Sequence, residues 1–280
     1  CLAVCPCGAI AYRETTGGYL LPDVDENACS LCGLCRKVCP GIHFGKTLMA
    51  NLPNDPFAGN VLGAFVGKAS DKKLFNHSQS GGIASALLVH ALNQGYITGA
   101  ITVTMHPGNP PRPWAGIAKT SQDILHAQKS KYCPVPVLGC LKDLSAHKGP
   151  VAVVGTPCHI HGLKNILDKQ PKLKKKIAFT IGLVCERVLT YAGMDYLVAQ
   201  AVKNQNSDNL LLHFKDKSLA GYPGPVHVFS GNDRSITLPA RTRMQIKDYF
   251  TPARCRICFD KMNVFSDITV GDPHGLEGVD

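Results

Sequence analysis

Most of the chain's thirteen cysteines stand at spacings that suit iron–sulfur chemistry. Residues 29–40 read CSLCGLCRKVCP, which is the complete C-x2-C-x2-C-x3-C-P run of a bacterial-type [4Fe–4S] site. Thiolates are soft ligands that suit iron–sulfur clusters or zinc. Zinc sites usually pair two C-x2-C arms across a longer gap, so the triple run followed by proline favours iron and sulfur.

The chain opens on CLAVCP, which has the spacing that normally closes such a run. In two-cluster ferredoxins, the last cysteine of each run crosses over to the other cluster. We therefore expect one cluster on four cysteines: Cys5, Cys29, Cys32 and Cys35. A second cluster is expected on Cys1 and Cys39, with two further ligands that would precede Cys1, so we expect the natural protein to be longer. Cys7 is interpreted as a spare thiol.

Four more cysteines lie in the stretches GTPCHIHG, IGLVCER and CRICFDKMN, namely Cys158, Cys185, Cys255 and Cys258. The first two follow predicted apolar strands, where an α/β sheet places residues that face a ligand. The last two form a C-x2-C arm. Four thiolates from three loops would close a further cube, whereas a single buried cysteine is usually a free thiol. Cys133 and Cys140 have no partner at such a spacing and are interpreted as core or loop residues.

Composition narrows the class of protein. The chain has 280 residues, 45% hydrophobic and 18% charged, which is typical of an ordinary globular chain with a sizeable core. No apolar run approaches the roughly eighteen residues of a membrane span, and we expect a cytoplasmic protein. The net charge of +10 suits an anionic ligand or an acidic partner. No recognition motif accompanies that charge, so a zinc-binding nucleic-acid module is disfavoured.

The secondary structure expected around these cysteines differs between the N-terminal segment and the rest of the chain. Two short strands are expected between the two N-terminal cysteine runs, in a ferredoxin-like domain over 1–44, and a Pro-, Asn- and Gly-rich linker over 45–60. Strands and helices then alternate, which predicts a mixed α/β domain over 61–280. The expected strands are 59–70, 99–105, 150–155 and 177–185, and the expected helices are 82–93, 120–130, 158–169 and 190–204. After residue 208 the helical pattern fades, and only short strands are predicted: 210–215, 225–231, 235–240 and 267–272.

Five stretches resemble, in order, the motifs of the coenzyme F420 hydrogenase/dehydrogenase beta-subunit family. They are SQSGGIASALLVHALNQGYITGAI, SKYCPVP, VAVVGTPCHIHGLKNI, IAFTIGLVC and CRICFDKMNVFSDITVGD. The likeness covers roughly residues 61–280. The preceding cysteine-rich segment resembles that of the longer members, such as F420H2 dehydrogenase input subunits and F420-dependent sulfite reductase. His159 stands where glutamine is usual, DPHG departs from the pattern of the hydrogenase subunits, and the chain stops before a segment that normally follows.

The resemblance implies an FAD-containing oxidoreductase subunit with [4Fe–4S] clusters, three of them in the full protein. Such a subunit exchanges a hydride with coenzyme F420 or another hydride carrier, and single electrons with a partner subunit or a ferredoxin. Cys158, Cys185, Cys255 and Cys258 fall where the family's cluster ligands fall. The implied flavin contacts are Ser80, Gly81, Gly82, Lys131, Tyr132, Gly155, Thr156 and Pro157. No side chain is assigned a catalytic role, because the chemistry is centred on the flavin.

Residue patterns alone leave alternatives open. On spacing alone, SQSGG is more typical of a serine helix cap with a tight turn than of a ligand site, and the resemblance reverses that preference. A ferredoxin-fed FAD reductase of an organic substrate and a non-catalytic electron-relay subunit are the alternative functions. Basic residues flank the C-x2-C arm, where they would attract an anionic deazaflavin tail or an acidic ferredoxin. They are Arg241, Arg243, Lys247, Arg254 and Arg256.

Overall fold

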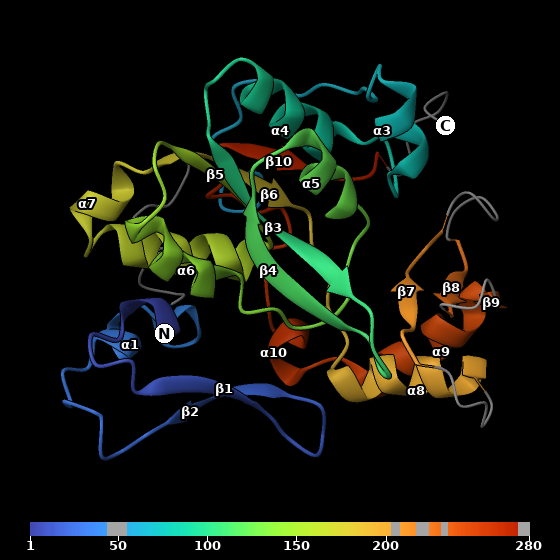
Figure 1. Ribbon diagram of the computed structural model, residues 1–280, viewed down its shortest axis with the longest axis horizontal. Coiled ribbons are helices and arrows are strands. Elements are labelled where there is room, and N and C mark those ends of the chain that lie inside the picture. Colours follow the sequence, from blue (N-terminus) through green and yellow to red (C-terminus); the bar gives the residue numbers. More distant parts are fainter. Residues whose placement is uncertain (44–54, 203–207, 217–223, 231–234, 274–280) are drawn as a thin grey trace.

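A five-stranded mixed sheet forms the centre of the molecule (Figure 1). The computed structural model describes residues 1–43, 55–202, 208–216, 224–230 and 235–273. The strand order is β10 (Ile268–Val270), β6 (Ile177–Leu183), β5 (Val151–Gly155), β3 (Gly99–His106) and β4 (Arg112–Ala118). The first four strands are parallel, and β4 runs antiparallel beside β3. The carboxyl ends of the parallel strands therefore meet at one edge, where α/β proteins gather their ligand-binding residues.

Helices cover both faces of this sheet, as the alternation of side chains along each strand requires. Ala100 and Ala152, which are neighbours across β3 and β5, pack in a core with residues of α4 (Ile83–Asn93) and α5 (Ser121–His126). Ile101 and Val153 point to the opposite face and pack with residues of α6 (Pro157–Leu167) and the 3-10 helix η2 (Val137–Ser145). Two shorter helices complete this part: α3 (Lys72–His77) and α7 (Pro171–Lys174).

A smaller lobe, formed by the chain between β6 and β10, lies to one side of the main sheet (Figure 1). It consists of an antiparallel sheet with helices against it: β7 (Leu211–His213), β8 (Val226–Phe229), β9 (Ser235–Leu238), α8 (Tyr191–Val202) and α9 (Ala240–Phe250). Its core holds Met194 and Leu197 of α8 against Phe214 and Val226, all fully buried. The short helix α10 (Ala253–Arg256) then carries the chain back to β10.

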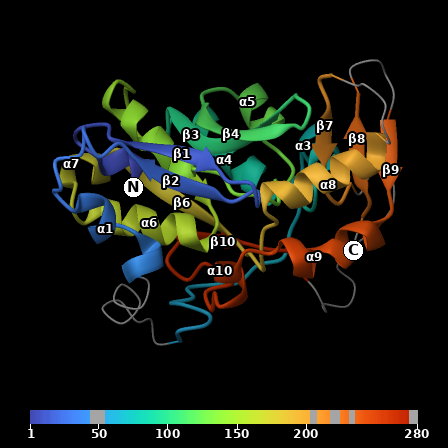
Figure 2. The same cartoon turned by 90° about the horizontal axis from the view of Figure 1, so that it is seen from below.

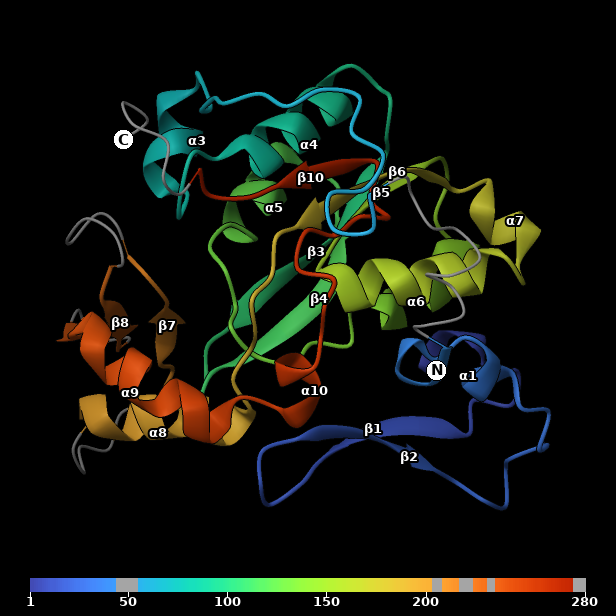
Figure 3. The same ribbon diagram turned by 180° about the vertical axis from the view of Figure 1, so that it is seen from behind.

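The N-terminal segment lies against α6 and η2 (Figure 3). It contains the 3-10 turn η1 (Leu2–Val4), the antiparallel hairpin β1 (Ile10–Glu14) and β2 (Leu20–Val24), and helix α1 (Leu34–Lys37). Figure 2 shows the hairpin from below, extended along the molecule towards α8. Val4 and Val38 are buried in the core shared with α6 and η2, and Asn165 of α6 donates to the carbonyl oxygen of Val38 at 3.3 Å. The segment that carries the first cysteines is therefore packed directly on the α/β part.

The alternation of strands and helices predicted from the sequence is confirmed. Helix α4 begins after Gly82, and Gly95 follows its end in the left-handed region, as the pattern over 82–93 predicts. The helix predicted over 120–130 is found as α5, which ends at His126 and begins with a capping box in which Thr120 and Asp123 bond reciprocally. The two N-terminal strands are also found. Within the described ranges, every helix is too short or too polar to span a bilayer.

Three expectations differ from the structure. Residues 59–70 contain no strand, because Leu62 and Phe65 lie almost fully exposed with no neighbouring strand to pair with. The region after residue 208 does contain a helix, α9, whose sequence ARTRMQIKDYF is too polar to show a clear apolar stripe. Strand β4 was not expected, because its pattern RPWAGIA lacks a regular alternation. Most of the predicted linker lies outside the described residues, and its described part is a turn closed by Asp55, which accepts from two backbone N–H groups.

Candidate functional site

The turn from β5 into α6 places Cys158 at the carboxyl edge of the sheet. Pro157 occupies the first turn of α6, where its missing N–H costs nothing. The backbone N–H of Thr156 donates to His159 Nδ1 at 3.3 Å, and His159 Nε2 lies 3.0 Å from the carbonyl oxygen of Val135. Burial lowers the pKa of His159 to about 4, so the ring is neutral, with its proton on Nε2. His159 thus fixes the turn that presents Cys158, a role that an amide side chain would also fill.

Asn263 ties this turn to the two other cysteine-bearing segments. Its fully buried side chain donates to the carbonyl oxygen of Gly155 at 2.9 Å and to that of Leu183 at 3.2 Å. Its own loop is held by Asp260, whose carboxylate accepts from the Asn263 N–H at 2.7 Å. A β-carbon at Gly182 would stand 2.5 Å from the Asn263 side chain, so only glycine fits there. The ends of β5 and β6 and the C-x2-C arm therefore meet at Asn263, which sequence reasoning did not single out.

The four cysteines of these segments lie within electrostatic reach of one another. Burial raises the pKa of the Cys185 thiol to about 12, and the neighbouring Cys158, Cys255 and Cys258 raise it further. Burial also raises the pKa of Cys258, while Lys261 opposes that shift. Lys261 donates to the Cys255 carbonyl oxygen at 3.1 Å and to that of Glu186 at 2.7 Å. The four cysteines thus come from three loops that meet near Lys261.

Burial keeps the thiols of Cys185 and Cys258 protonated. A bound metal would take the place of those protons on the sulfur atoms, so the residues present fit a metal site. Among the described side chains, no three His, Cys, Asp or Glu residues converge closely enough for one metal ion. A single zinc ion holds its sulfur ligands about 2.3 Å away, which draws them tightly together. Ligation of a [4Fe–4S] cluster by the four C-terminal cysteines stays a prediction.

The N-terminal cysteines are arranged around the start of the chain. Cys1 lies within electrostatic reach of Cys39 and Cys35. Cys32 is exposed, and the Leu34 N–H, followed by the Ser30 hydroxyl, lowers the pKa of its thiol. The sharing of Cys5, Cys29, Cys32 and Cys35 by one cluster and of Cys1 and Cys39 by another stays a prediction.

The Cys39 turn lies close to the C-terminal cysteine arm. A β-carbon at Gly41 would stand 3.4 Å from the Arg254 guanidinium and 3.5 Å from the Cys39 sulfur. A β-carbon at Gly162 of α6 would stand 3.5 Å from the ring of Pro40. Arg254 directly precedes Cys255, so the two cysteine groups approach each other where α10 meets the Cys39 turn.

The segments expected to contact flavin are brought together by Gln79. Its amide Nε2 donates to the Tyr132 hydroxyl at 3.2 Å, and its Oε1 accepts from the Ser130 N–H at 2.9 Å. The Ser80–Gly82 turn thus lies beside Tyr132. Gly82 adopts φ +76° at the start of α4, and no side chain caps that helix, so its first N–H groups are available to a ligand.

Lys131 is engaged by the protein itself. Its ammonium group donates to the carbonyl oxygens of Ala127 and Gln128, at 2.6 and 2.7 Å, and so caps the end of α5. Burial lowers the pKa of Lys131 to about 7, and the charge of Lys129 adds to that shift. Gly155, Thr156 and Pro157 form the turn that presents Cys158. The contacts of all eight residues with flavin stay a prediction.

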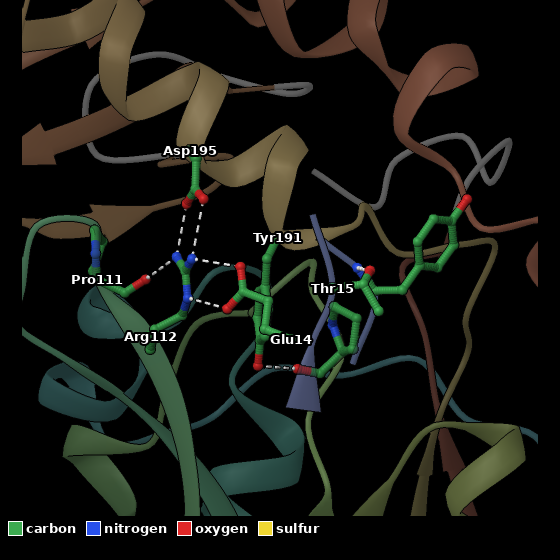
Figure 4. A network of polar contacts seen from close by, with 8 residues as sticks. Glu14, Thr15, Pro111, Arg112, Tyr191 and Asp195 are labelled. Carbon is green, nitrogen blue, oxygen red and sulfur yellow. Dashed lines mark hydrogen bonds and ion pairs between the residues drawn. The ribbon is translucent and has the colours of Figure 1, made fainter. Parts of the chain in front are cut away.

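An arginine joins the N-terminal hairpin to the body of the molecule (Figure 4). Arg112 of β4 donates to both oxygens of Asp195 on α8, at 2.7 and 3.0 Å, and to both oxygens of Glu14 on β1, at 3.0 and 3.3 Å. Its guanidinium also lies 4.5 Å from the ring centre of Tyr191. The Tyr191 N–H donates to the Gly18 carbonyl oxygen at 2.8 Å. We call the group of Glu14, Arg112 and Asp195 the Arg112 clamp.

Comparison with known proteins agrees with this architecture. Residues 64–142 match the model of the N-terminal part of the coenzyme F420 hydrogenase/dehydrogenase beta subunit, and residues 149–279 match that of its C terminus. Together these matches span most of the chain and include every cysteine of the C-terminal group. The chain belongs to the coenzyme F420 hydrogenase/dehydrogenase beta-subunit family.

Individual relatives span different lengths of the chain. It is 27% identical to the beta subunit of the coenzyme F420 hydrogenase of Methanosarcina barkeri, over 80% of this chain and 76% of that subunit. It is 26% identical to a subunit of the F420H2 dehydrogenase of Methanosarcina mazei, over 99% of this chain and 75% of that one. It is 24% identical to the coenzyme F420-dependent sulfite reductase of Methanocaldococcus jannaschii, over 97% of this chain and 41% of that protein.

The fold has a counterpart among solved structures. A chain of the F420-reducing [NiFe] hydrogenase complex of Methanosarcina barkeri superimposes with a TM-score of 0.57 at 24% identity, covering 78% of this chain and 73% of that one. The mixed α/β fold predicted from the sequence is therefore that of the family.

Proposed function

We propose that this chain is a flavin-containing iron–sulfur oxidoreductase subunit. It exchanges a hydride with coenzyme F420 and passes single electrons through [4Fe–4S] clusters to or from a partner subunit. The observation that carries this proposal is that Asn263 and Lys261 join the three loops of Cys158, Cys185, Cys255 and Cys258 at the carboxyl edge of the family's sheet. A ligand site at that edge is what parallel α/β topology favours.

The proposed cofactors divide the chemistry between them. A flavin takes up a hydride as an electron pair and gives up electrons singly, which is the chemistry that it would supply here. The chain's own residues hold the cofactors and exclude water. The four C-terminal cysteines would ligate the cluster nearest the flavin, with Asn263 fixing their three loops and Lys261 supplying a positive charge beside them.

The residues around Gln79 are proposed to hold FAD. The first N–H groups of α4 offer donors to phosphate, and Gly82 keeps side-chain bulk away from them. Tyr132 offers an aromatic ring beside the same turn. Lys131 is proposed to contribute to flavin binding indirectly. By capping α5 it holds the segment that carries Tyr132 in place.

The N-terminal segment is proposed to relay electrons between that site and a partner. Residues 1–44 would form the ferredoxin-like domain, 45–60 the linker, and 61–280 the flavin-binding domain. The approach of Arg254 to the Cys39 turn supports a route in which the Cys39 cluster lies next to the C-terminal one. The Arg112 clamp keeps the hairpin that carries Glu14 in a fixed position on the body.

Cofactor loading provides the first test. After anaerobic reconstitution with iron, sulfide and FAD, we expect the protein to retain flavin through gel filtration and to show the broad visible absorbance of iron–sulfur centres. The flavin is then released by denaturation and measured by its fluorescence. If the protein holds clusters but no flavin, the result favours a non-catalytic electron-relay subunit over a hydride-exchanging enzyme. Zinc in place of iron would contradict the proposal altogether.

A further inference from the structure

Tyr132 is surrounded by cationic side chains from several elements. The Lys215 ammonium lies 5.2 Å from the centre of the Tyr132 ring, and the Arg243 guanidinium carbon lies 5.8 Å from it. Phe214 meets the ring edge-on, with centroids 5.3 Å apart. The hydroxyl accepts from Gln79. Two positive charges therefore share one half-buried aromatic ring.

Arg243 has a donor that the protein does not use. Its Nε–H is shielded from solvent and has no hydrogen-bond acceptor among the described residues. An arginine stays charged at all relevant pH values, so it cannot relieve this cost by losing a proton. A shielded N–H donor without an acceptor costs free energy that a ligand from outside the chain would recover by accepting from it.

The nearby carboxylate is already engaged. Asp216 is 3% exposed, and its Oδ2 lies 3.2 Å from the Lys129 ammonium, 3.7 Å from His213 Nδ1 and 3.6 Å from His227 Nδ1. Burial lowers the pKa of His213 to about 4, with Lys129 as the next contribution, although Asp216 opposes the shift. The region thus keeps an excess of positive charge, because Asp216 faces Lys129 while Lys215 and Arg243 lie beside the Tyr132 ring.

We infer that Arg243 and Lys215, beside the Tyr132 ring, form a binding site for a phosphate group. A guanidinium offers a planar pair of donors that matches phosphate oxygens, and the ammonium adds a second charge. The inference rests on the proposed function, because Gln79 places this site next to the Ser80–Gly82 turn. The phosphate would belong either to FAD or to the anionic tail of the hydride carrier.

The test compares Arg243→Gln with the matched control Arg13→Gln, which removes a largely exposed arginine of β1 that has no part in the proposed site. Affinities are measured by flavin fluorescence quenching with FAD and riboflavin, and by titration of flavin-loaded protein with F420 and with its tail-free deazaflavin fragment. We expect Arg243→Gln to weaken one phosphate-bearing ligand by about tenfold to a hundredfold, as loss of a charge-assisted hydrogen bond does. The affinity of Arg243→Gln for the phosphate-free ligands, and the affinity of the control variant for every ligand, should change by less than about threefold.

The two arms identify the source of the phosphate. A loss confined to FAD assigns the site to the flavin, and a loss confined to F420 assigns it to the carrier. Unchanged affinity for both in Arg243→Gln overturns the inference. If that variant does not fold, Arg243→Lys takes its place, with the same ligands and limits. If the wild-type protein binds no flavin, the proposed function fails. The phosphate site is then tested alone with inorganic pyrophosphate: thermal stabilisation of the wild type that disappears in the Arg243 variant supports the site. No stabilisation of the wild type by pyrophosphate overturns the inference.

Discussion

Replacing Cys255 with alanine should remove about four iron atoms per chain while leaving flavin bound. Cys255 is one of the three cysteines near Cys185, and a closed cube needs all four thiolates. The predicted flavin contacts at the Ser80–Gly82 turn and Tyr132 come from other segments, so they should survive. Without the cluster next to the flavin, the fast reduction of the N-terminal clusters should disappear. Iron analysis, flavin content and stopped-flow absorbance measure the three quantities.

The matched control is Cys7→Ala, which changes an exposed cysteine outside all three predicted ligand sets. It should keep the iron content, the flavin content and the fast transfer of the wild type. Wild-type iron content and transfer rate in Cys255→Ala would contradict the assignment of the C-terminal cluster. Because structural clusters contribute to folding, Cys158→Ala offers a second variant on a different loop.

Replacing Arg112 with methionine should release the N-terminal hairpin from the body. The change removes the hydrogen bonds to Asp195 and Glu14 and leaves these two carboxylates near each other without a cation. Arg112 is about one-third exposed, so we expect a loss in unfolding free energy of about 2 kcal/mol, below that of a fully buried pair. Amide hydrogen exchange in residues 10–24 should accelerate by more than the global loss explains.

A control for this experiment lies on the same hairpin. Arg13 pairs with Asp23 at 3.7 Å, but both side chains are largely exposed, so Arg13→Gln should change exchange and stability very little. Flavin content should stay at the wild-type level in both variants. Equal exchange protection of the hairpin in Arg112→Met and wild type would show that the clamp does not position it.

The sequence indicated the candidate ligands of the site, but it did not indicate the contacts that hold their loops together. The spacing of Cys29, Cys32, Cys35 and Cys39 is a local feature of the sequence, so it can be recognised without knowing the fold. The gathering of Cys158 and Cys185 could be predicted because each follows an apolar strand of a parallel sheet. Asn263 gave no such signal, because its partners are the carbonyl oxygens of Gly155 and Leu183, which only the fold brings near.

Long-range and polar features were the ones that sequence patterns missed. The Arg112 clamp joins side chains from three distant segments, and nothing local marks Glu14 or Asp195 as its partners. Helix α9 was missed because its exposed polar residues obscure its apolar face, and Arg243 lies on it. The strand expected at 59–70 was wrong because an apolar run needs a neighbouring strand as well as suitable residues.

Anaerobic mixing of the reconstituted protein with reduced F420 tests the central claim most directly. Reduced ferredoxin and NADPH serve as comparison donors, and absorbance reports the flavin and the iron–sulfur centres on the same trace. The account predicts that reduced F420 bleaches the flavin and then the clusters, that NADPH does not, and that oxidised F420 reverses the change. Bleaching by NADPH or ferredoxin with no response to reduced F420 would contradict it.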